Sequence, residues 1–323
     1  MTLDNSKYQF AMKRALELAL NGPAWGVNPQ VGAVILDADL NVIAEGWHEG
    51  AGTPHAEVMA LANLTSTFGA VPSGATAVVT LEPCNHTGRT GPCAQALIAA
   101  GISRVVFAST DPGDASSKGA ETLRAAGIEV IGGVLEAQAD YQNRVWLTAA
   151  KQGLPFVTLK WASTLDGRAA ANDGTSKWIS GSESRADAHR RRSEIDAIVV
   201  GTGTVAADNP ELTARKPDGS LYEHQPLRVV VGERALDQGS RVFNSDSETV
   251  QVKSHDIHDV LNQLKELGVK HVMVEGGPKL ASQFVQAGVV NEYLVYLAPM
   301  LLGGSRLATT DFGVSTMGEA KNL

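Results

Sequence analysis

The chain has 323 residues, of which 43% are hydrophobic and 19% are charged, and this size and composition predict a globular protein with two domains. Its net charge of −8 argues against nucleic acid as a partner, because phosphate binding needs clustered basic residues. The sequence contains no apolar run of about 18 residues that would predict a membrane span. Residues 1–7 also lack the basic and apolar regions of a signal peptide. We therefore expect neither nucleic acid nor a membrane as a partner.

The first half of the chain predicts an α/β layer. Apolar spacing predicts a helix over 8–20, and two apolar runs at 31–36 and 42–47 predict a β-hairpin. Thr53 is a residue type that favours the N-cap of a helix, and Pro54 is one that favours the first helical position. A helix is therefore expected to start there. Strands and helices then alternate, which is typical of an α/β fold. The expected strands are 75–81, 104–108 and 128–131, and the expected helices are 93–100, 119–126 and 136–149.

A second α/β series follows a helix-ending segment, Lys-Gln-Gly-Leu-Pro at 151–155. We therefore expect one domain over 1–150 and another over 151–323. The expected strands of the second series are 156–161, 197–200, 227–231, 249–252, 271–274 and 292–297. Helices are expected at 184–192, 257–267 and 279–287, and the mostly polar stretch 217–225 is expected to be a surface loop.

One histidine and the only two cysteines of the chain form its most informative pattern. His55 precedes Glu57 by two residues, and Cys84 and Cys93, each next to a proline, follow in one short segment. A histidine and two thiolates leave one position open on a tetrahedral zinc ion, and catalytic zinc keeps that position for water. The order His-x-Glu, then Pro-Cys and Cys, matches the signature of zinc deaminases, apart from a longer gap between the cysteines. The pattern predicts zinc-dependent deamination.

Glu57 is the predicted catalytic acid–base, because bound zinc lowers the pKa of its water to about 7 and a carboxylate must then carry protons to the ring nitrogen and the leaving ammonia. His55 and Glu57 are expected in the first turn of the helix capped by Thr53, and Cys93 in the first turn of the next helix. Two alternatives remain: a structural zinc with His86 as fourth ligand, or two unrelated core cysteines. Neither gives Glu57 a role. Since both cysteines belong to this motif, none remains for a disulfide, and a reducing cytoplasm is the expected compartment.

With these residues in hand, the first half resembles the bifunctional riboflavin-biosynthesis deaminase/reductases of bacteria. The resemblance is carried by Asn-Pro-Gln-Val-Gly-Ala-Val at 28–34, Gly-Trp-His at 46–48, His-Ala-Glu at 55–57 and the segment 81–93. The long gap between the cysteines separates this family from cytidine and transfer-RNA deaminases. The resemblance implies a diamino-hydroxypyrimidine substrate that carries a phosphoribosylamino group. It also implies that Asn28, His48 and the loop 85–90 line the substrate pocket.

Alternatives stay open for these pocket residues. Asn28 stands before Pro29, and this pair is also typical of a turn. Arg89 is also compatible with an ordinary solvated side chain. An amide at position 28 nevertheless suits a pyrimidine edge, because it offers both a donor and an acceptor.

The second half is similar to the reductase domain of the same family, through 160–168, 176–180, 201–205, 208–210 and 274–278. The resemblance implies a cytidine-deaminase-like α/β/α zinc domain followed by a dihydrofolate-reductase-like α/β domain, with Zn²⁺ and NADPH as cofactors. The residues that it places at the cofactor are Ala162, Trp178, Thr204, Asp208, Gly277, Pro278, Lys279, Leu280, Ala281, Ser282 and Gln283. The residues that it places at the ribosyl substrate are Ser176, Arg192, Leu212, Arg215 and Glu275.

Some of these assignments have support in the residues themselves. Gly276 and Gly277 stand directly before an expected helix, where bare N–H groups and the helix dipole suit a phosphate, although such a segment is also typical of a tight turn. Arg192 and Arg215 suit the 5′-phosphate of the substrate, although the Arg-Arg-Arg run at 190–192 also fits a solvated helix face. No Gly-x-Gly-x-x-Gly follows the first strand, which argues against a Rossmann unit.

The resemblance leaves the proton donor of the reduction open between Glu275 and Lys160. In the family, the pattern continues past the position of Leu323 into closing strands of the reductase sheet, so we expect an open sheet edge here. A partner subunit would cover that edge, which makes a homo-oligomer a hypothesis.

The sequence thus predicts deamination of the pyrimidine in the first domain and reduction of the ribosyl group to a ribityl chain in the second. Two rival functions are a zinc deaminase of another base with a non-reducing second domain, and a binding module with structural zinc.

Overall fold

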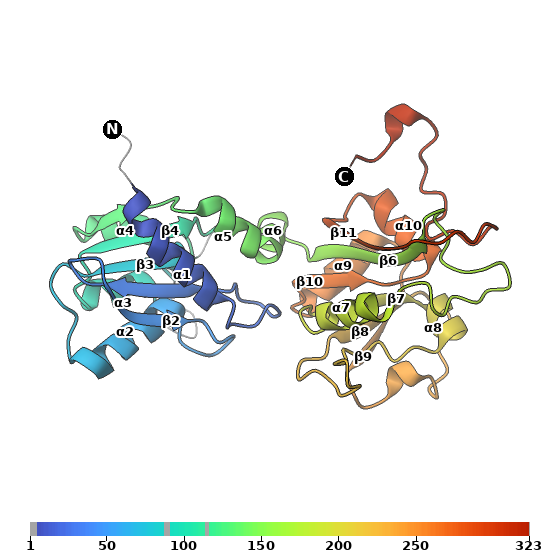
Figure 1. Cartoon of the computed structure of the whole chain (residues 1–323), viewed down its shortest axis with the longest axis horizontal. Coiled ribbons are helices and arrows are strands. Elements are labelled where there is room, and N and C mark those ends of the chain that lie inside the picture. Colours follow the sequence, from blue (N-terminus) through green and yellow to red (C-terminus); the bar gives the residue numbers. More distant parts are fainter. Residues whose placement is uncertain (1–4, 87–90, 114–115, 323) are drawn as a thin grey trace. The chain divides into compact units, whose positions relative to one another are not determined.

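The computed structural model describes residues 5–86, 91–113 and 116–322. Within it the chain divides into two compact units, residues 1–153 and 154–323. Both units are α/β structures built around one sheet each, so the predicted α/β class is confirmed (Figure 1). No helix in the described part of the chain is long and apolar enough to cross a membrane.

The sheet of the first unit has five strands in the order β2-β1-β3-β4-β5. β1 pairs antiparallel with β2 and with β3, and β3, β4 and β5 run parallel. The hairpin predicted over 31–47 is therefore confirmed. The strands are β1 (Gly32–Leu36), β2 (Val42–Trp47), β3 (Thr76–Leu81), β4 (Arg104–Ser109) and β5 (Glu129–Ile131). The helices are η1 (Asn5–Tyr8), α1 (Gln9–Ala19), α2 (Ala56–Phe68), α3 (Cys93–Ala99), α4 (Gly119–Ala125), α5 (Glu136–Gln142) and α6 (Arg144–Gln152).

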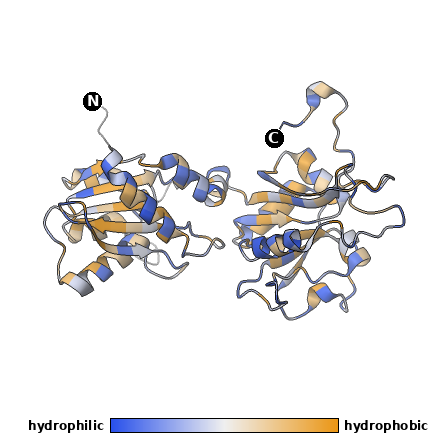
Figure 2. Cartoon of the chain, viewed as in Figure 1, coloured by the Kyte–Doolittle hydropathy of each residue, from blue (hydrophilic) through white to orange (hydrophobic). Residues whose placement is uncertain are grey.

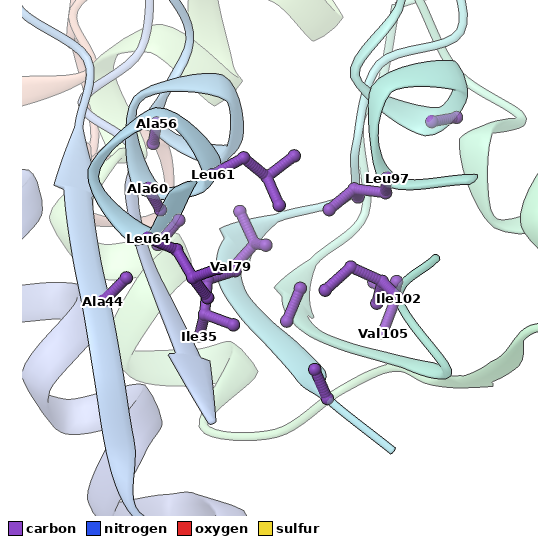
Figure 3. Close-up of a cluster of buried hydrophobic side chains, with 14 of the residues drawn as sticks. Ile35, Ala44, Ala56, Ala60, Leu61, Leu64, Val79, Leu97, Ile102 and Val105 are labelled. Atoms are coloured by element: carbon purple, nitrogen blue, oxygen red, sulfur yellow. The ribbon is translucent and has the colours of Figure 1, made fainter. Parts of the chain in front are cut away.

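Alternating side chains of the central strands build a core on each face of this sheet. Ala33 and Ile35 of β1 point to the face covered by α2, α3 and α4, whereas Val34 and Leu36 point to the face covered by α1 and α5. Figure 3 shows Leu61 and Leu64 of α2 packed over the first face. Because both faces of the sheet are covered, β1 and β3 are buried along their full length.

Two details of the first unit differ from the sequence prediction. The helix expected over 136–149 is two helices separated at Asn143, whose side chain bonds both the backbone N–H and the carbonyl of Gln30 at 3.1 and 2.8 Å. The helix expected to be capped by Thr53 begins at Ala56, with His55 at the N-cap position. The Thr53 hydroxyl instead donates to the Gly50 carbonyl at 2.8 Å. The break between the two helices thus coincides with a contact to Gln30, which lies far away in the sequence, and a local sequence pattern does not reveal such a contact.

The second unit contains six parallel strands in the order β11-β6-β10-β7-β8-β9. The strands are β6 (Phe156–Thr164), β7 (Ala197–Gly201), β8 (Leu227–Val231), β9 (Thr249–Val252), β10 (His271–Val274) and β11 (Glu292–Ala298). The helices are α7 (Ser182–Arg192), α8 (Thr202–Asp208), α9 (Ile257–Glu266) and α10 (Pro278–Ala287), with short turns η2 (Arg241–Phe243) and η3 (Met317–Glu319). The sequence prediction missed α8.

The core of the second unit lies on both faces of its sheet. Helices α9 and α10 cover one face through Leu261, Leu264 and Phe284, and α8 covers part of the other through Val205. The strands are mainly hydrophobic in Figure 2, as is typical of buried parallel strands. Because all six strands run parallel, the segments that follow β10, β7, β8 and β9 all leave from one edge of the sheet. Ligands of open α/β sheets bind at this carboxyl edge.

Candidate active sites

Three segments of the first unit bring one histidine and two cysteines together. His55 is the N-cap of α2, Cys84 follows β3, and Cys93 is the first residue of α3. Their ligand atoms all lie within 4.8 Å of one another, with His55 Nδ1 at 3.1 Å from Cys93 Sγ and 3.6 Å from Cys84 Sγ. One nitrogen and two sulfurs in this arrangement fit zinc, with room for a fourth, non-protein ligand. The predicted metal ligands converge on a single candidate site.

Hydrogen bonding within this cluster favours the thiolate of Cys84 but not that of Cys93, because the bond with Cys84 and burial raise the pKa of the Cys93 thiol. The bond with Cys93, then the bond with His55, lowers the pKa of the Cys84 thiol despite its burial. The bond with Cys84 in turn raises the pKa of His55. The backbone N–H of Cys93 also donates to Cys84 Sγ at 3.4 Å. A thiolate is thus stabilised before any metal binds, and metal binding would displace the proton that the cluster shares.

Glu57 lies beside the cluster, in the first turn of α2, and lines the same pocket. Only 4% of its surface is exposed. Burial raises the pKa of Glu57, because the carboxylate is costly to desolvate. The candidate ligand set does not include it. A buried carboxyl of raised pKa next to an open metal position is suited to accept and release a proton.

The pocket at this cluster has a volume of about 150 Å³ and is lined by Asn28, His48, His86 and Trp146 as well as by Glu57. Asn28 Nδ2 lies 2.8 Å from His48 Nε2, and His48 Nδ1 lies 3.0 Å from the Pro54 carbonyl oxygen. Burial lowers the pKa of His48, and only 4% of its surface is exposed. Among the described residues, His86 belongs to the pocket wall but not to the ligand cluster, so the cluster contains three protein ligands.

Two acidic residues of this pocket were not singled out from the sequence. Glu82 Oε1 accepts from the Ala120 N–H at 3.0 Å, and its Oε2 accepts from the Asp111 N–H at 3.3 Å. Both Glu82 and Asp111 are buried and line the pocket. Glu82 thereby fixes the chain just before Cys84. The position of Glu82 directly before Pro83-Cys84 was the only sequence signal for its role. Spacing alone does not distinguish a residue that fixes the backbone from a metal ligand. Residues 87–90, which include the predicted substrate contact Arg89, lie outside the described residues.

The second unit holds a buried charge cluster around Glu275, the residue that follows β10. Arg192 donates to both carboxylate oxygens, at 2.7 and 2.9 Å, and Lys160 donates to one of them at 3.0 Å. Their side chains are 7% exposed for Glu275, 15% for Arg192 and 17% for Lys160. Burial opposes the charge of Glu275, but the positive charges of Arg192 and Lys160 outweigh it and lower its pKa. Glu275 is therefore a carboxylate at neutral pH.

A second ring of contacts supports this cluster. The Lys160 ammonium lies 5.6 Å from the centre of the Tyr296 ring, and the Tyr296 hydroxyl donates to Asp187 at 2.7 Å. Asp187 also accepts from Arg190 and Arg191 at 2.7 and 3.0 Å. Burial raises the pKa of Asp187, but the bonds from Tyr296 and then from the two arginines outweigh it and lower that pKa to about 2. The contacts tie β11 to α7 beside the buried charges.

A cavity of about 700 Å³ lies at the carboxyl edge of the second sheet. Seven of the predicted cofactor residues line it, namely Thr204, Asp208, Gly277, Pro278, Lys279, Leu280 and Gln283. Ala281 and Ser282 are buried in α10 at 2% and 3% exposure, and Ser282 Oγ donates to the Thr310 carbonyl. Ala162 sits on β6 opposite Tyr296 of β11. The predicted cofactor set thus contains both cavity-lining residues and residues that pack behind or beside them.

The remaining predicted substrate residues are spread over a neighbouring region. A cavity of about 480 Å³ is lined by Trp178, Arg185, His189, Arg215 and Lys216. The Arg185 guanidinium stacks over the Trp178 ring at 4.2 Å, and Arg215 pairs with Glu211. Two further predicted residues are Ser176, which is exposed, and Leu212, which is buried at 5% exposure. Three basic side chains therefore border this cavity, whereas Arg192 is bound to Glu275.

The comparisons with known proteins agree with the two units. Residues 5–109 match the cytidine and deoxycytidylate deaminase zinc-binding region, and residues 155–322 match the RibD C-terminal domain. The chain is 48% identical over 293 residues to the riboflavin biosynthesis protein RibD of Mycobacterium tuberculosis, covering 90% of this chain and 85% of that protein. It is 37% identical over 329 residues to RibD of Escherichia coli, with coverages of 91% and 88%.

Solved structures show the same likeness over nearly the whole chain. A diaminohydroxyphosphoribosylaminopyrimidine deaminase/5-amino-6-(5-phosphoribosylamino)uracil reductase from Thermotoga maritima superposes with a TM-score of 0.86 at 36% identity, covering 97% of this chain and 92% of that one. RibD of Acinetobacter baumannii superposes with a TM-score of 0.87 at 37% identity, covering 98% and 93%.

The fold and the zinc-binding region define a deaminase joined to a reductase. More particularly, the chain belongs to the RibD family of bifunctional enzymes of riboflavin biosynthesis. The resemblance, the fold class and the dual activity predicted from the sequence are thereby confirmed.

Proposed function

We propose that the first unit removes the exocyclic amine of 2,5-diamino-6-(5-phosphoribosylamino)pyrimidin-4-one, with zinc held by His55, Cys84 and Cys93. One observation carries this proposal: the three donor atoms lie within 4.8 Å of one another in a pocket that also contains the buried carboxyl of Glu57. Zinc, when bound, supplies a water whose pKa is lowered to about 7. The donor set fits the metal, because a nitrogen and two sulfurs are zinc ligands and no fourth protein ligand closes the described cluster.

Glu57 moves the protons of this hydrolysis. It accepts a proton from the attacking water and releases it toward the ring nitrogen and the leaving ammonia, so that C–NH₂ and water become C=O and NH₃. The raised pKa of Glu57 suits both transfers, because its two protonation states are closer in energy than those of a solvated glutamate. Asn28 and His48 border the ring. The pocket of about 150 Å³ is smaller than the roughly 300–1,000 Å³ of sites that enclose a whole ligand, so it holds the reacting ring while the sugar phosphate extends beyond it.

We further propose that the second unit binds NADPH along the carboxyl edge of its sheet. NADPH, when bound, supplies the hydride that converts the ribosyl group to a ribityl chain. The cavity fits a dinucleotide, because Gly277 is the N-cap of α10 and leaves the first N–H groups of that helix without intrahelical partners. Thr204 shapes this end of the cavity by accepting the Gly277 N–H at 3.1 Å.

The sugar of the substrate belongs beside the Glu275 cluster. Of the two predicted proton donors, Lys160 is the group that can give up a proton, because Glu275 is held as a carboxylate. The 5′-phosphate fits the cavity that Arg185, Arg215 and Lys216 border. Arg192, also predicted at the substrate, is bound bidentately to Glu275 and so orients that carboxylate. Ser176 and Leu212 remain proposals on the family pattern alone.

A zinc-to-protein ratio measured together with ammonia release tests the deaminase proposal. Glu57→Gln should keep the zinc and lower the rate of ammonia release by about 10²- to 10⁴-fold, because proton transfer contributes that much. Glu82→Gln is the matched control. It alters another buried carboxylate of the same pocket, but one that accepts hydrogen bonds from backbone N–H groups and has no proposed role in proton transfer. Unchanged ammonia release by Glu57→Gln with zinc bound would overturn the mechanism.

Oxidation of NADPH in the presence of the deaminated product tests the reductase proposal. Turnover is expected from the second unit whether or not the zinc site is intact. The rival function weighed from the sequence, deamination with a non-reducing second domain, would instead give no NADPH oxidation at any concentration of that product. A cytoplasmic location fits the chemistry, because the zinc site needs both buried cysteines as thiolates and not as a disulfide. A homo-oligomer stays a prediction that light scattering of the purified chain would test.

A further inference from the structure

The cavity proposed for the 5′-phosphate also contains a titratable group to which the reduction gives no role. The cavity has a volume of about 480 Å³, and Arg185, Arg215 and Lys216 border it. Glu183 is the one carboxylate among its described lining residues. His189, on α7, lines the same cavity, and a histidine is the side chain whose charge changes nearest to neutral pH. Its contacts suit it to respond to an anionic ligand.

The backbone occupies one ring nitrogen of His189. Nδ1 lies 3.0 Å from the Thr213 carbonyl oxygen and 3.3 Å from the Arg215 backbone nitrogen. The shorter contact decides the tautomer, because a carbonyl oxygen only accepts, so Nδ1 carries the hydrogen. The same carbonyl accepts from Arg192 Nη1 at 3.0 Å, which holds it in place. Nε2 is therefore the nitrogen left for a ligand, as a bare lone pair in the neutral ring and as an N–H donor in the protonated ring.

The surrounding charges keep this ring neutral when no ligand is bound. Burial lowers the pKa of His189, and the positive charges of Arg192 and, more weakly, Arg215 lower it further. The bond to the Thr213 carbonyl and the negative charge of Glu275 act in the opposite sense but do not outweigh them. The three cations along the cavity outnumber its one described carboxylate, so the wall also disfavours another positive charge. His189 without a ligand is accordingly uncharged at neutral pH.

A bound phosphate monoester reverses this balance. Its second pKa is about 6, so it carries nearly two negative charges at neutral pH. Such an anion favours a positive ring beside it, and a charge-assisted N–H···O bond is stronger than a neutral one. We propose that His189 takes up a proton from solvent when the 5′-phosphate of the substrate binds, and donates a hydrogen bond from Nε2 to a phosphate oxygen. The site of the phosphate in this cavity is part of the proposed reductase function, on which the role of His189 rests.

The proton uptake belongs to substrate binding and not to the chemical step. The phosphate is not a reacting group, so its bond with His189 is made equally before and during hydride transfer. Such a bond lowers KM and leaves kcat unchanged. The pKa of His189 is higher with the phosphate bound than without it, so the affinity is greatest below the ligand-free pKa and falls as the pH rises toward the bound pKa. Uptake of one proton weakens binding by up to about tenfold per pH unit within that window.

Calorimetry with ribose 5-phosphate on the full chain measures this proton directly. Titrations at about pH 7.5, where the probe is almost fully dianionic, are made in two buffers of different ionisation enthalpy and so report protons taken from the buffer. We expect the native chain to take up a substantial fraction of one proton per site. His189→Gln should take up none and bind the probe about 3- to 10-fold more weakly, because its amide can still donate to the Thr213 carbonyl but cannot gain a charge. His258→Gln changes an exposed histidine of α9 and, as the matched control, should keep the native uptake.

NADPH oxidation with the deaminated product checks the same role under turnover. The KM of the native chain should rise with pH through neutrality, whereas the KM of His189→Gln should vary less and its kcat should stay within about twofold. If the native chain takes up no proton with ribose 5-phosphate, or if His189→Gln takes up as much, the role given to His189 is wrong.

Arg215→Gln separates that failure from a failure of the proposed function. If the phosphate lies in this cavity, the variant should bind ribose 5-phosphate about 10- to 100-fold more weakly, because a charge-assisted contact is lost. If the variant binds the probe as tightly as the native chain, or if the native chain does not bind it, the proposed site of the phosphate fails, and the role of His189 fails with it.

Discussion

The two α/β units assemble their sites in different ways. In the first, His55, Cys84 and Cys93 come from the starts of two helices and one loop, and the reacting chemistry is concentrated in about 150 Å³. In the second, a cavity of about 700 Å³ lies at a sheet edge, and a separate set of charged residues, Glu275, Arg192 and Lys160, is buried in ion pairs. In the proposed function, the first site holds a metal and moves one proton. In the same proposal, the second site holds an extended cofactor near a carboxylate that is fixed by ion pairs.

The difference implies that the first site depends on a few donor atoms and the second on a network. Loss of one donor should therefore abolish the first activity with little effect elsewhere. Loss of one member of the Glu275 cluster should disturb the stability of the whole second unit. Four substitutions, ordered from the largest expected effect to the smallest, test this contrast.

The largest effect is expected from Cys93→Ser. This change removes one of three metal ligands, so most of the bound zinc and nearly all ammonia release should be lost, by more than about 10³-fold. NADPH oxidation with the deaminated product should stay within about twofold of the native rate, because the chain divides into separate compact units. Zinc content and both activities measure the outcome. A parallel loss of the reductase would show that the two units are not independent.

The second-largest effect is expected from Glu275→Gln. This change leaves Arg192 and Lys160 buried without a negative partner, so the second unit should lose about 3–5 kcal/mol of stability. The folded-state pKa of Glu275 is lowered, so its contribution is complete above the unfolded-state pKa of about 4.3 and is lost as the pH falls toward the folded value. Urea denaturation should accordingly show a large gap between variant and native chain at pH 7 and a smaller one near pH 3. A gap that does not depend on pH would contradict the ion-pair explanation.

Arg228→Met tests a buried cation with a different set of partners. Its guanidinium, on β8, is fully buried and donates to the Glu211 carbonyl, to both oxygens of Asn244 and to the Ser247 carbonyl. Methionine fills much of the same space but leaves those acceptors unsatisfied, so we expect a loss of about 1–3 kcal/mol. The deaminase should be unaffected. A loss of stability as large as that of Glu275→Gln would show that the ion-paired cluster around Glu275 contributes no more to stability than another buried charged residue.

The smallest effect is expected from Tyr296→Phe, which removes only the hydroxyl that donates to Asp187. The ring beneath Lys160 remains, so we expect a loss of about 1 kcal/mol in stability and a small change in the KM of the reduction. Tyr296→Leu also removes the ring and should raise the KM further. Equal behaviour of the two variants would show that the ring does not position Lys160.

The predictability of each site follows from how far apart its residues lie in the sequence. The candidate zinc ligands and Glu57 could be singled out because their spacing is itself the chemical signal, and three of these residues converge in the structure. The pairing of Lys160 with Glu275 spans 115 positions, and only the order of the parallel strands brings the two together. The glycines before α10 could be recognised in the sequence, but the cavity that Gly277 lines could not.

The errors in secondary structure have the same origin. The helix predicted over 136–149 is interrupted at Asn143, because its amide bonds the backbone of Gln30, 113 positions away. Helix α8 was missed because Thr202, Gly203 and Thr204 have weak helical preference. Thr53 resembled an N-cap by composition, yet its hydroxyl turns back to Gly50. Local pattern therefore located most elements, and distant contacts decided their ends.

The contacts of His48 have a consequence for which ring atoms the first pocket can accept. The Pro54 carbonyl only accepts hydrogen bonds, so His48 Nδ1 must carry the hydrogen, and the lowered pKa of His48 leaves Nε2 as a bare lone pair. The NH₂ of Asn28 must then donate to Nε2, which leaves the side-chain oxygen of Asn28, a residue of the pocket wall, as a hydrogen-bond acceptor. This wall therefore has a fixed polarity. If the pyrimidine binds in this pocket as proposed, the wall suits an amino or ring N–H, whereas a lone pair at that position would meet a second lone pair.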